Sequence, residues 1–165
     1  MSTRHIARSA IIAAIYALLT LIFQPISFGA VQARIAEALT LLPILMPEAI
    51  PGLAVGCVVA NLIGGAAIYD VLFGSLATLL AAVMTRIFRN KPPVAAIFPV
   101  VFNAVITGAV VYFCYEIQFD LNLFSYKMLL LTCLYVGAGE ALVVYALGMP
   151  AAIYLKKRDP KIFRN

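Results

Sequence analysis

The sequence is poor in the residues and motifs that carry covalent catalysis. Its one histidine is His5, its three cysteines form no CxxC pair, and it contains neither an HExxH nor a GxxxxGK[ST] motif. A zinc site, a Ser–His triad and a phosphate-binding loop are therefore unsupported. We expect no enzyme activity, no metal and no cofactor, and no ATP hydrolysis through a phosphate-binding loop.

Charge is also scarce in this chain. Of its 165 residues, 12% are charged and 64% are hydrophobic, and the mean hydropathy is +1.03. Soluble domains contain about 25% charged and 45–50% apolar residues. The apolar runs are continuous rather than alternating, which argues against a β-barrel, and in lipid such runs form helices. The prediction is an all-α integral membrane protein with a single transmembrane domain over residues 1–165.

Six apolar segments, separated by prolines, glycines or polar stretches, predict six transmembrane helices. We expect these helices at about residues 6–23, 31–46, 50–68, 70–88, 94–115 and 127–155. An even number of spans puts both termini on one side, and ten of the twelve Lys and Arg residues then lie on that side. Because positive loops favour the cytoplasm, both termini are expected there. Basic residues clustered at a membrane surface argue against nucleic-acid binding.

Five polar residues interrupt the predicted membrane helices. An ionised side chain at mid-bilayer costs about 2.5–3.5 kcal/mol, so such residues face inward and find partners. A helix rises about 1.5 Å per residue, which gives an estimate of how deep each residue lies in the membrane. By these depths, the polar side chains could line one cavity from the outer face towards mid-membrane. They are the candidate substrate-binding residues, namely Arg34, Glu37, Asn61, Asn103 and Glu140.

Each of these residues also has a structural interpretation. Arg34 and Glu37, three residues apart on one helical face, either form a mutual ion pair or contact a ligand. Glu140 is either protonated or bonded to a neighbouring helix, or it binds the ligand. For the two asparagines, hydrogen bonds between helices compete with ligand contacts. Asp70 is expected nearer the membrane surface, and the polar stretch 116–127 is either a lid or a connector.

The first apolar segment carries a stripe of small residues. Ser9, Ala13 and Ala17 repeat every four residues, as do Ala10 and Ala14. Small residues at this spacing allow another helix to approach closely. The partner helix belongs either to this chain or to another protein.

Two stretches carry a resemblance to a known family. The runs "QARIAEALTLLPILMPEAIPGLAVGCVVANL" and "YDVLFGSLATLLAA" resemble the QueT family of queuosine-precursor transporters. The resemblance extends over most of residues 5–155 and is strongest over 32–82. Ala33 stands where the family often has a bulky residue, and Ala36 where serine is common. Both departures leave the arginine and glutamate of this motif in place.

The resemblance implies the substrate-binding (S) component of an energy-coupling factor (ECF) transporter, with a six-helix fold. It implies a membrane-embedded coupling subunit and two cytosolic ATPases as partners, in the cell membrane of a prokaryote. The S component then topples in the membrane to release its cargo inside. The small-residue face of the first helix would dock onto the coupling subunit through Ala10, Ala13, Ala14 and Ala17.

The implied cargo is 7-cyano- or 7-aminomethyl-7-deazaguanine. Its guanine-like donor edge suits a carboxylate, for which Glu37 or Glu140 is the candidate. Arg34 would donate to the ring carbonyl or orient Glu37, with Asn61 and Asn103 as side contacts. Two alternatives stay open. One is an S component for another flat heterocycle or vitamin, and the other is a membrane scaffold subunit whose polar groups only satisfy one another.

Overall fold

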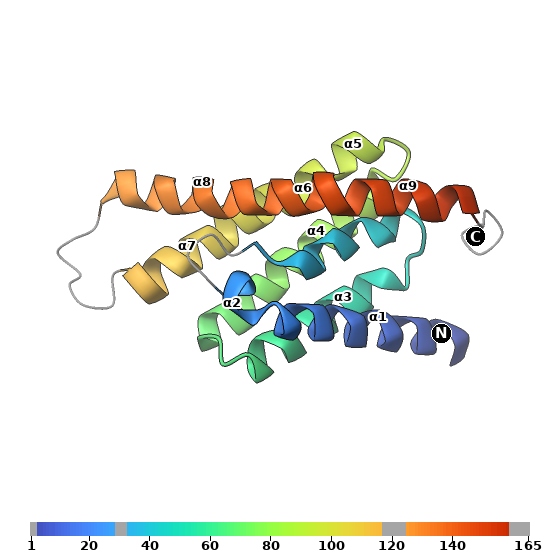
Figure 1. Cartoon of the computed structure of the whole chain (residues 1–165), viewed down its shortest axis with the longest axis horizontal. Coiled ribbons are helices and arrows are strands. Elements are labelled where there is room, and N and C mark those ends of the chain that lie inside the picture. Colours follow the sequence, from blue (N-terminus) through green and yellow to red (C-terminus); the bar gives the residue numbers. More distant parts are fainter. Residues whose placement is uncertain (1–2, 29–32, 117–124, 159–165) are drawn as a thin grey trace.

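The computed structural model describes residues 3–28, 33–116 and 125–158, and these residues are helical without strands. Figure 1 shows the helices lying roughly along one axis, with the start of α1 and the end of α9 at the same end of the molecule. This arrangement agrees with an even number of crossings. The stretch 117–124, which holds most of the polar connection between the last two segments, lies outside the described residues.

Each of the six predicted segments contains a helix. The elements are α1 (Thr3–Ile22), α2 (Gln24–Ser27), η1 (Ile35–Ile44), α3 (Ala49–Ile63), η2 (Asp70–Gly74), α4 (Ser75–Ile87), α5 (Pro92–Ala95), α6 (Ile97–Phe102), η3 (Asn103–Thr107), α7 (Gly108–Val111), η4 (Tyr112–Glu116), α8 (Tyr126–Val143), η6 (Val144–Gly148) and α9 (Met149–Arg158). Consecutive elements join into three longer helical stretches, which begin at Asp70, at Pro92 and at Tyr126. The all-helical prediction is confirmed for the described residues.

Four of these helical stretches are long and apolar enough to cross a membrane. They cover Thr3–Ile22, Asp70–Ile87, Pro92–Cys114 and Tyr126–Arg158. The other two apolar helices, η1 and α3, are shorter. Six complete crossings and a cytoplasmic position for both termini therefore stay predictions.

The second segment differs from the predicted membrane α-helix over 31–46. It is a 3₁₀ helix of 10 residues, it begins at Ile35, and it contains Pro43. Proline has no backbone N–H to donate, which weakens regular α-helical bonding around it. A 3₁₀ helix rises about 2.0 Å per residue, so η1 extends roughly 20 Å, which is short of the apolar core of a bilayer.

Wide π-helical turns occur at four places in the described chain, in η2, η3, η4 and η6. Two of them begin at polar residues, η2 at Asp70 and η3 at Asn103. Such turns often occur at functional sites. At two of the four places, a departure from regular α-helix thus coincides with a polar position of an apolar segment.

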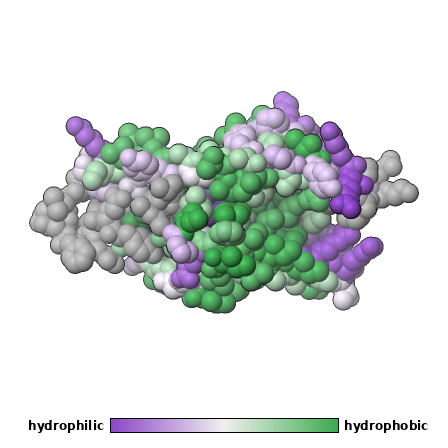
Figure 2. Space-filling model, in the orientation of Figure 1, coloured by the Kyte–Doolittle hydropathy of each residue, from purple (hydrophilic) through white to green (hydrophobic). Residues whose placement is uncertain are grey.

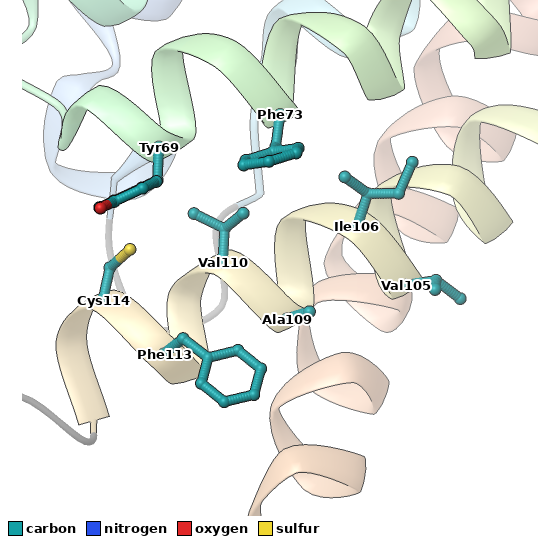
Figure 3. Close-up of a pocket in the computed structure, with 8 residues that line it drawn as sticks. All are labelled: Tyr69, Phe73, Val105, Ile106, Ala109, Val110, Phe113 and Cys114. Atoms are coloured by element: carbon teal, nitrogen blue, oxygen red, sulfur yellow. The ribbon is translucent and has the colours of Figure 1, made fainter. Parts of the chain in front are cut away.

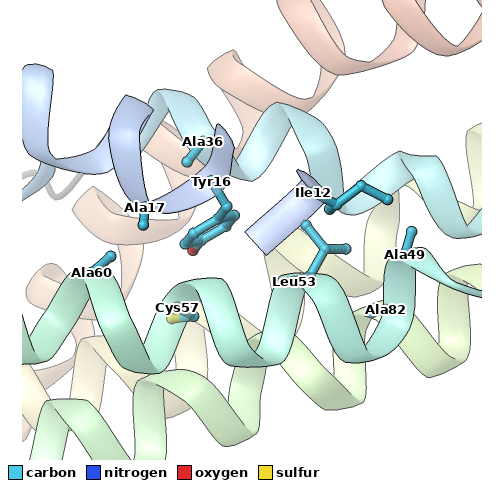
Figure 4. Packing of buried hydrophobic residues seen from close by; sticks show 9 residues of the cluster. All are labelled: Ile12, Tyr16, Ala17, Ala36, Ala49, Leu53, Cys57, Ala60 and Ala82. Carbon is cyan, nitrogen blue, oxygen red and sulfur yellow. The ribbon is translucent and has the colours of Figure 1, made fainter. Parts of the chain in front are cut away.

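Helices α1 and α3 pack closely against each other, as Figure 4 shows around Tyr16 and Cys57. The contact depends on two glycines of α3. A Cβ on Gly52 would lie 2.7 Å from Ser9 O, and one on Gly56 would lie 2.8 Å from Ala13 O. Alanine at either position would force the two helices apart.

This packing divides the small-residue stripe of α1. Ala13 is half-buried against Gly56, and Ala17 belongs to the core with 8% of its surface exposed. Ala10 and Ala14 are exposed on another face of the same helix. The four alanines therefore do not form one free surface, and docking through this helix is a proposal for Ala10 and Ala14.

The outer surface is suited to lipid. Large apolar side chains such as Ile22, Leu62 and Leu142 are 57–68% exposed. Figure 2 shows a broad hydrophobic surface along the molecule, with much of the strongly hydrophilic surface at the end that holds the start of α1. Exposed apolar area of this extent would be unfavourable in water and is favourable in a bilayer.

Contacts from Glu48 connect α1 to the turn before α3 at that end. Arg8 Nη1 donates to Glu48 Oε1 at 3.2 Å, and Ser9 Oγ donates to the backbone oxygen of Glu48 at 2.8 Å. His5 Nε2 lies 3.6 Å from the same carboxylate oxygen. Burial raises the pKa of Glu48, but its backbone hydrogen bond and the bond from Arg8 outweigh that effect and hold the pKa below its ordinary value.

Candidate functional site

The structure brings the five predicted site residues into one buried polar cluster, together with residues that the sequence did not single out. Their exposed fractions are 4% for Arg34, 1% for Glu37, 0% for Asn61, 5% for Asn103 and 2% for Glu140. They come from helices that are far apart in the sequence. The additional members are Tyr16 of α1, Asp70 of η2 and Thr78 of α4.

Arg34 forms its ion pair with Asp70, with 2.8 Å between Nη2 and Oδ2. Asp70 is fully buried inside the protein, with an exposed fraction of 0%, and its depth in the membrane stays a prediction. Arg34 also donates from Nε to Ser27 O at 3.4 Å, and its guanidinium carbon lies 5.3 Å from the centre of the Phe28 ring. These contacts fix the guanidinium at the start of η1.

The position of the Asp70 carboxylate depends on Gly74, one turn later in the same helix. A Cβ at Gly74 would lie 2.6 Å from Asp70 Oδ1 and 3.5 Å from Asn61 Nδ2. No heavy atom fits at such a distance from the carboxylate oxygen. The glycine therefore leaves room for Asp70 to turn towards Arg34.

Glu37 accepts hydrogen bonds from two hydroxyl groups. The donors to its Oε1 are Tyr16 from α1 and Thr78 from α4, the latter at 3.3 Å. Tyr16 is fully buried between α1 and α3, where Figure 4 shows its ring among the apolar residues of the cluster. The carboxylate thus lies where η1, α1 and α4 meet.

Asn61 is bonded to the neighbourhood of Asp70. Its Nδ2 donates to the backbone oxygen of Asp70 at 3.1 Å and lies 3.6 Å from Cys57 Sγ. Thr78 Oγ1 is 3.5 Å from the same sulfur. This is the interhelical hydrogen bonding that the sequence offered as one interpretation, and it does not use the amide oxygen.

Asn103 joins the two glutamates of the cluster. Its Nδ2 donates to Glu140 Oε1 at 3.0 Å, its Oδ1 accepts from Thr107 Oγ1 at 3.3 Å, and it interacts with the Glu37 carboxylate. The negative charge of Glu37 also acts on Glu140. The side chains of η1, η3 and α8 therefore form one electrostatically connected group.

Three buried oxygen atoms of this cluster have no hydrogen-bond partner among the described residues. They are Glu37 Oε2, Asn61 Oδ1 and Asp70 Oδ1. Buried acceptors are normally satisfied, and leaving one unsatisfied costs about 1–3 kcal/mol. All three can therefore each accept a further hydrogen bond.

The cavity at this cluster is small. Its volume is about 10 Å³, and it is lined by Arg34, Asn103, Thr107, Val136 and Glu140. About 10–15 Å³ holds one water, whereas ligand pockets measure about 300–1,000 Å³. As these side chains stand, the cavity is too small for a heterocycle, which would fit only if they separated.

A larger groove of about 480 Å³ lies elsewhere, between Tyr69 and Phe73 on one side and η3, α7 and the start of η4 on the other (Figure 3). Its walls are apolar, and Tyr69, Phe73 and Phe113 are each about half exposed. In a bilayer this surface faces acyl chains. It offers no charged group to a polar heterocycle, so the polar cluster is the better candidate site.

The sequence missed Tyr16 and Thr78, and it missed the role of Asp70 as the partner of Arg34. Tyrosine and threonine are common in membrane helices, and nothing in their spacing distinguishes these two from packing residues. Asp70 was visible as a charge beside an apolar run and could have been tested as a partner for Arg34. Within the described ranges, no group of three or more His, Cys, Asp or Glu side chains is placed to hold a metal ion.

Comparison with known proteins gives one match. A family model described as QueT transporter matches residues 6–157. No curated protein and no solved structure matches the chain.

Proposed function

The chain belongs to the QueT transporter family, and on that premise we propose that it is the substrate-binding S component of an ECF importer in the cell membrane of a prokaryote. It is a membrane transporter and not an enzyme. The cargo is a queuosine precursor, 7-cyano- or 7-aminomethyl-7-deazaguanine, captured from outside. A coupling subunit and two cytosolic ATPases supply the energy.

The observation that carries this proposal is the buried cluster with unsatisfied acceptors. A 7-deazaguanine presents a ring N–H and an amino group side by side, and a carboxylate accepts both. Glu37 Oε2 and Asp70 Oδ1 are buried acceptors without a partner in the described chain. Asn61 Oδ1 adds a third acceptor. The donor-rich edge of the cargo therefore matches what the cluster lacks.

The cationic side of the cluster complements the other part of the ring. Arg34 lines the small cavity, and a guanidinium donates to a ring carbonyl oxygen. Glu140 and Asn103 line the same cavity from α8 and η3. In this proposal the cargo contacts five predicted residues once the cavity has opened, namely Arg34, Glu37, Asn61, Asn103 and Glu140. Asp70 holds the arginine through Oδ2 and offers Oδ1 to the cargo.

Transport requires a surface for the coupling subunit. Ala10 and Ala14 are exposed on α1, and alanine lets a second helix approach closely. Ala13 and Ala17 serve the contact with α3, so their part in docking is indirect. We place the coupling subunit on the face of α1 that contains the two exposed alanines.

Binding to the purified full-length protein tests the cargo. Calorimetry with both deazaguanines, guanine and a set of vitamins should give sub-micromolar affinity for at least one deazaguanine. Glu37→Gln should weaken this binding. Glu48→Gln is the same change at a buried carboxylate outside the cluster, and it should leave the binding unchanged. Sub-micromolar binding of a vitamin alone would move the proposal to another S-component cargo. No binding by any of these compounds would favour a scaffold subunit.

A further inference from the structure

The buried cluster holds more negative than positive charge. Three of its side chains are carboxylates, Glu37, Asp70 and Glu140, and each is at most 2% exposed. Arg34 is the one basic side chain among the described residues that is buried. Its Nη2 lies 2.8 Å from Asp70 Oδ2, so the guanidinium charge is balanced by that carboxylate.

The hydrogen bonds that the two glutamates receive come from uncharged donors. Tyr16 and Thr78 donate to Glu37, and Asn103 donates to Glu140. Such bonds satisfy oxygen atoms without cancelling charge. If both glutamates are ionised, their charges repel each other, and the nearby arginine is already paired with Asp70.

A buried carboxylate without a counter-charge is unfavourable by several kcal/mol, so it takes up either a proton or a cation. Glu37 Oε2 has no hydrogen-bond partner in the described chain, and Asn103 and Glu140, which interact with Glu37, line the small cavity. The vacant acceptor and the cavity therefore lie in the same group of side chains. The vacant acceptor suits a ligand that brings hydrogen-bond donors, and the excess of carboxylates over basic groups suits one that brings positive charge.

We infer that the cargo binds as a cation, with a protonated amine held between Glu37 and Glu140, and that Glu140 determines selectivity for this amine over a neutral analogue. The inference rests on the proposed function and specifies its substrate. A primary ammonium carries three donors and no acceptor, which suits two carboxylates. An alkyl amine of this kind is protonated near neutral pH, since the comparable lysine amine has a pKa of about 10.4.

The two deazaguanines named above form a matched pair of probes. They share the ring, and with it the contacts proposed for Arg34, Asp70 and Asn61. They differ in one arm, which is a charged aminomethyl group in one and an uncharged cyano group in the other. A difference in affinity between them therefore reports on the carboxylates that face the arm.

Calorimetry on the purified full-length protein decides the charge of the cargo without any variant. The aminomethyl form should bind at least about 30-fold more tightly than the cyano form, as a buried charge pair predicts. Equal or tighter binding of the cyano form would overturn the cationic cargo and leave the proposed function standing. Failure of both compounds to bind would overturn the proposed function and this inference with it.

Variants then locate the selectivity. Glu140→Gln should remove most of the preference by weakening the aminomethyl form, with less than about threefold change for the cyano form. Glu48→Gln, the matched control, should keep the full preference. If Glu140→Gln does not fold, Glu37→Gln should weaken both compounds, because Glu37 also faces the shared ring, and should weaken the aminomethyl form more. An unchanged preference in a folded glutamate variant would contradict the assignment of that residue.

Discussion

Arg34 and Asp70 are separated by 36 positions in the sequence, yet their side chains form a buried ion pair of 2.8 Å. The pair connects the start of η1 to the start of the helix that continues through α4. Both partners carry charges that would be costly alone in this environment. The pair therefore fixes the relative positions of two helices at the place where the other polar residues converge.

Asp70→Asn should strongly destabilise the isolated protein. It leaves the Arg34 guanidinium buried without a counter-charge, and breaking such a pair costs about 3–5 kcal/mol. Thermal unfolding in detergent would measure the loss. The double variant Arg34→Met with Asp70→Leu removes both charges and should recover most of the stability without restoring cargo binding. If the double variant is as unstable as the single one, charge burial is not the cause.

Gly74→Ala should act through the Asp70 carboxylate. The added methyl would lie 2.6 Å from Oδ1, so the carboxylate must leave its position beside Arg34. Loss of one charged hydrogen bond predicts at least about a tenfold weaker affinity for the cargo. In an Asp70→Ala background the same glycine change should have little further effect. Additive losses in the double variant would mean that Gly74 serves packing instead.

The two faces of α1 should respond differently to bulk. Ala13→Leu places a larger side chain against Gly56 of α3, and overpacking of this kind costs about 1–3 kcal/mol. Ala14→Leu projects from an exposed position, so stability and cargo binding by the isolated protein should be unchanged. Uptake by cells that contain the coupling subunit should nevertheless fall with Ala14→Leu. Normal uptake would remove this face from the proposed docking surface.

Acid should weaken the contact between α1 and the turn before α3. The folded protein holds the pKa of Glu48 below its ordinary value of 4.5, so the charged carboxylate contributes stability above pH 4.5. That contribution is lost as the pH falls from 4.5 through the lower pKa of the folded state. Glu48→Gln should reduce the dependence of the unfolding temperature on pH in this range. An identical dependence in the variant and the wild type would contradict the assignment.

The sequence predicted the helical class and the approximate limits of the segments because long apolar runs in lipid have few alternatives. It could not predict that η1 is a 3₁₀ helix. The difference between 3₁₀ and α bonding depends on local packing as well as on Pro43. The predicted helix over 50–68 runs past the observed end of α3 at Ile63, where Gly65 follows with a positive φ of 73°.

The sequence also selected the polar residues of the cluster but assigned their partners incompletely. Helical spacing placed Arg34 beside Glu37, whereas the structure pairs the arginine with Asp70 and bonds the glutamate to Tyr16 and Thr78. Such pairs depend on how helices from distant parts of the chain meet. That information is not contained in the spacing of residues within one helix.

The closed cavity of about 10 Å³ has a kinetic consequence. A planar bicyclic molecule cannot enter it, so association waits for an opening motion, and the observed on-rate should reach a plateau at high cargo concentration. Because only opened molecules bind, the apparent affinity equals the intrinsic affinity scaled by the opened fraction. A substitution that favours opening would then tighten capture without touching the cargo.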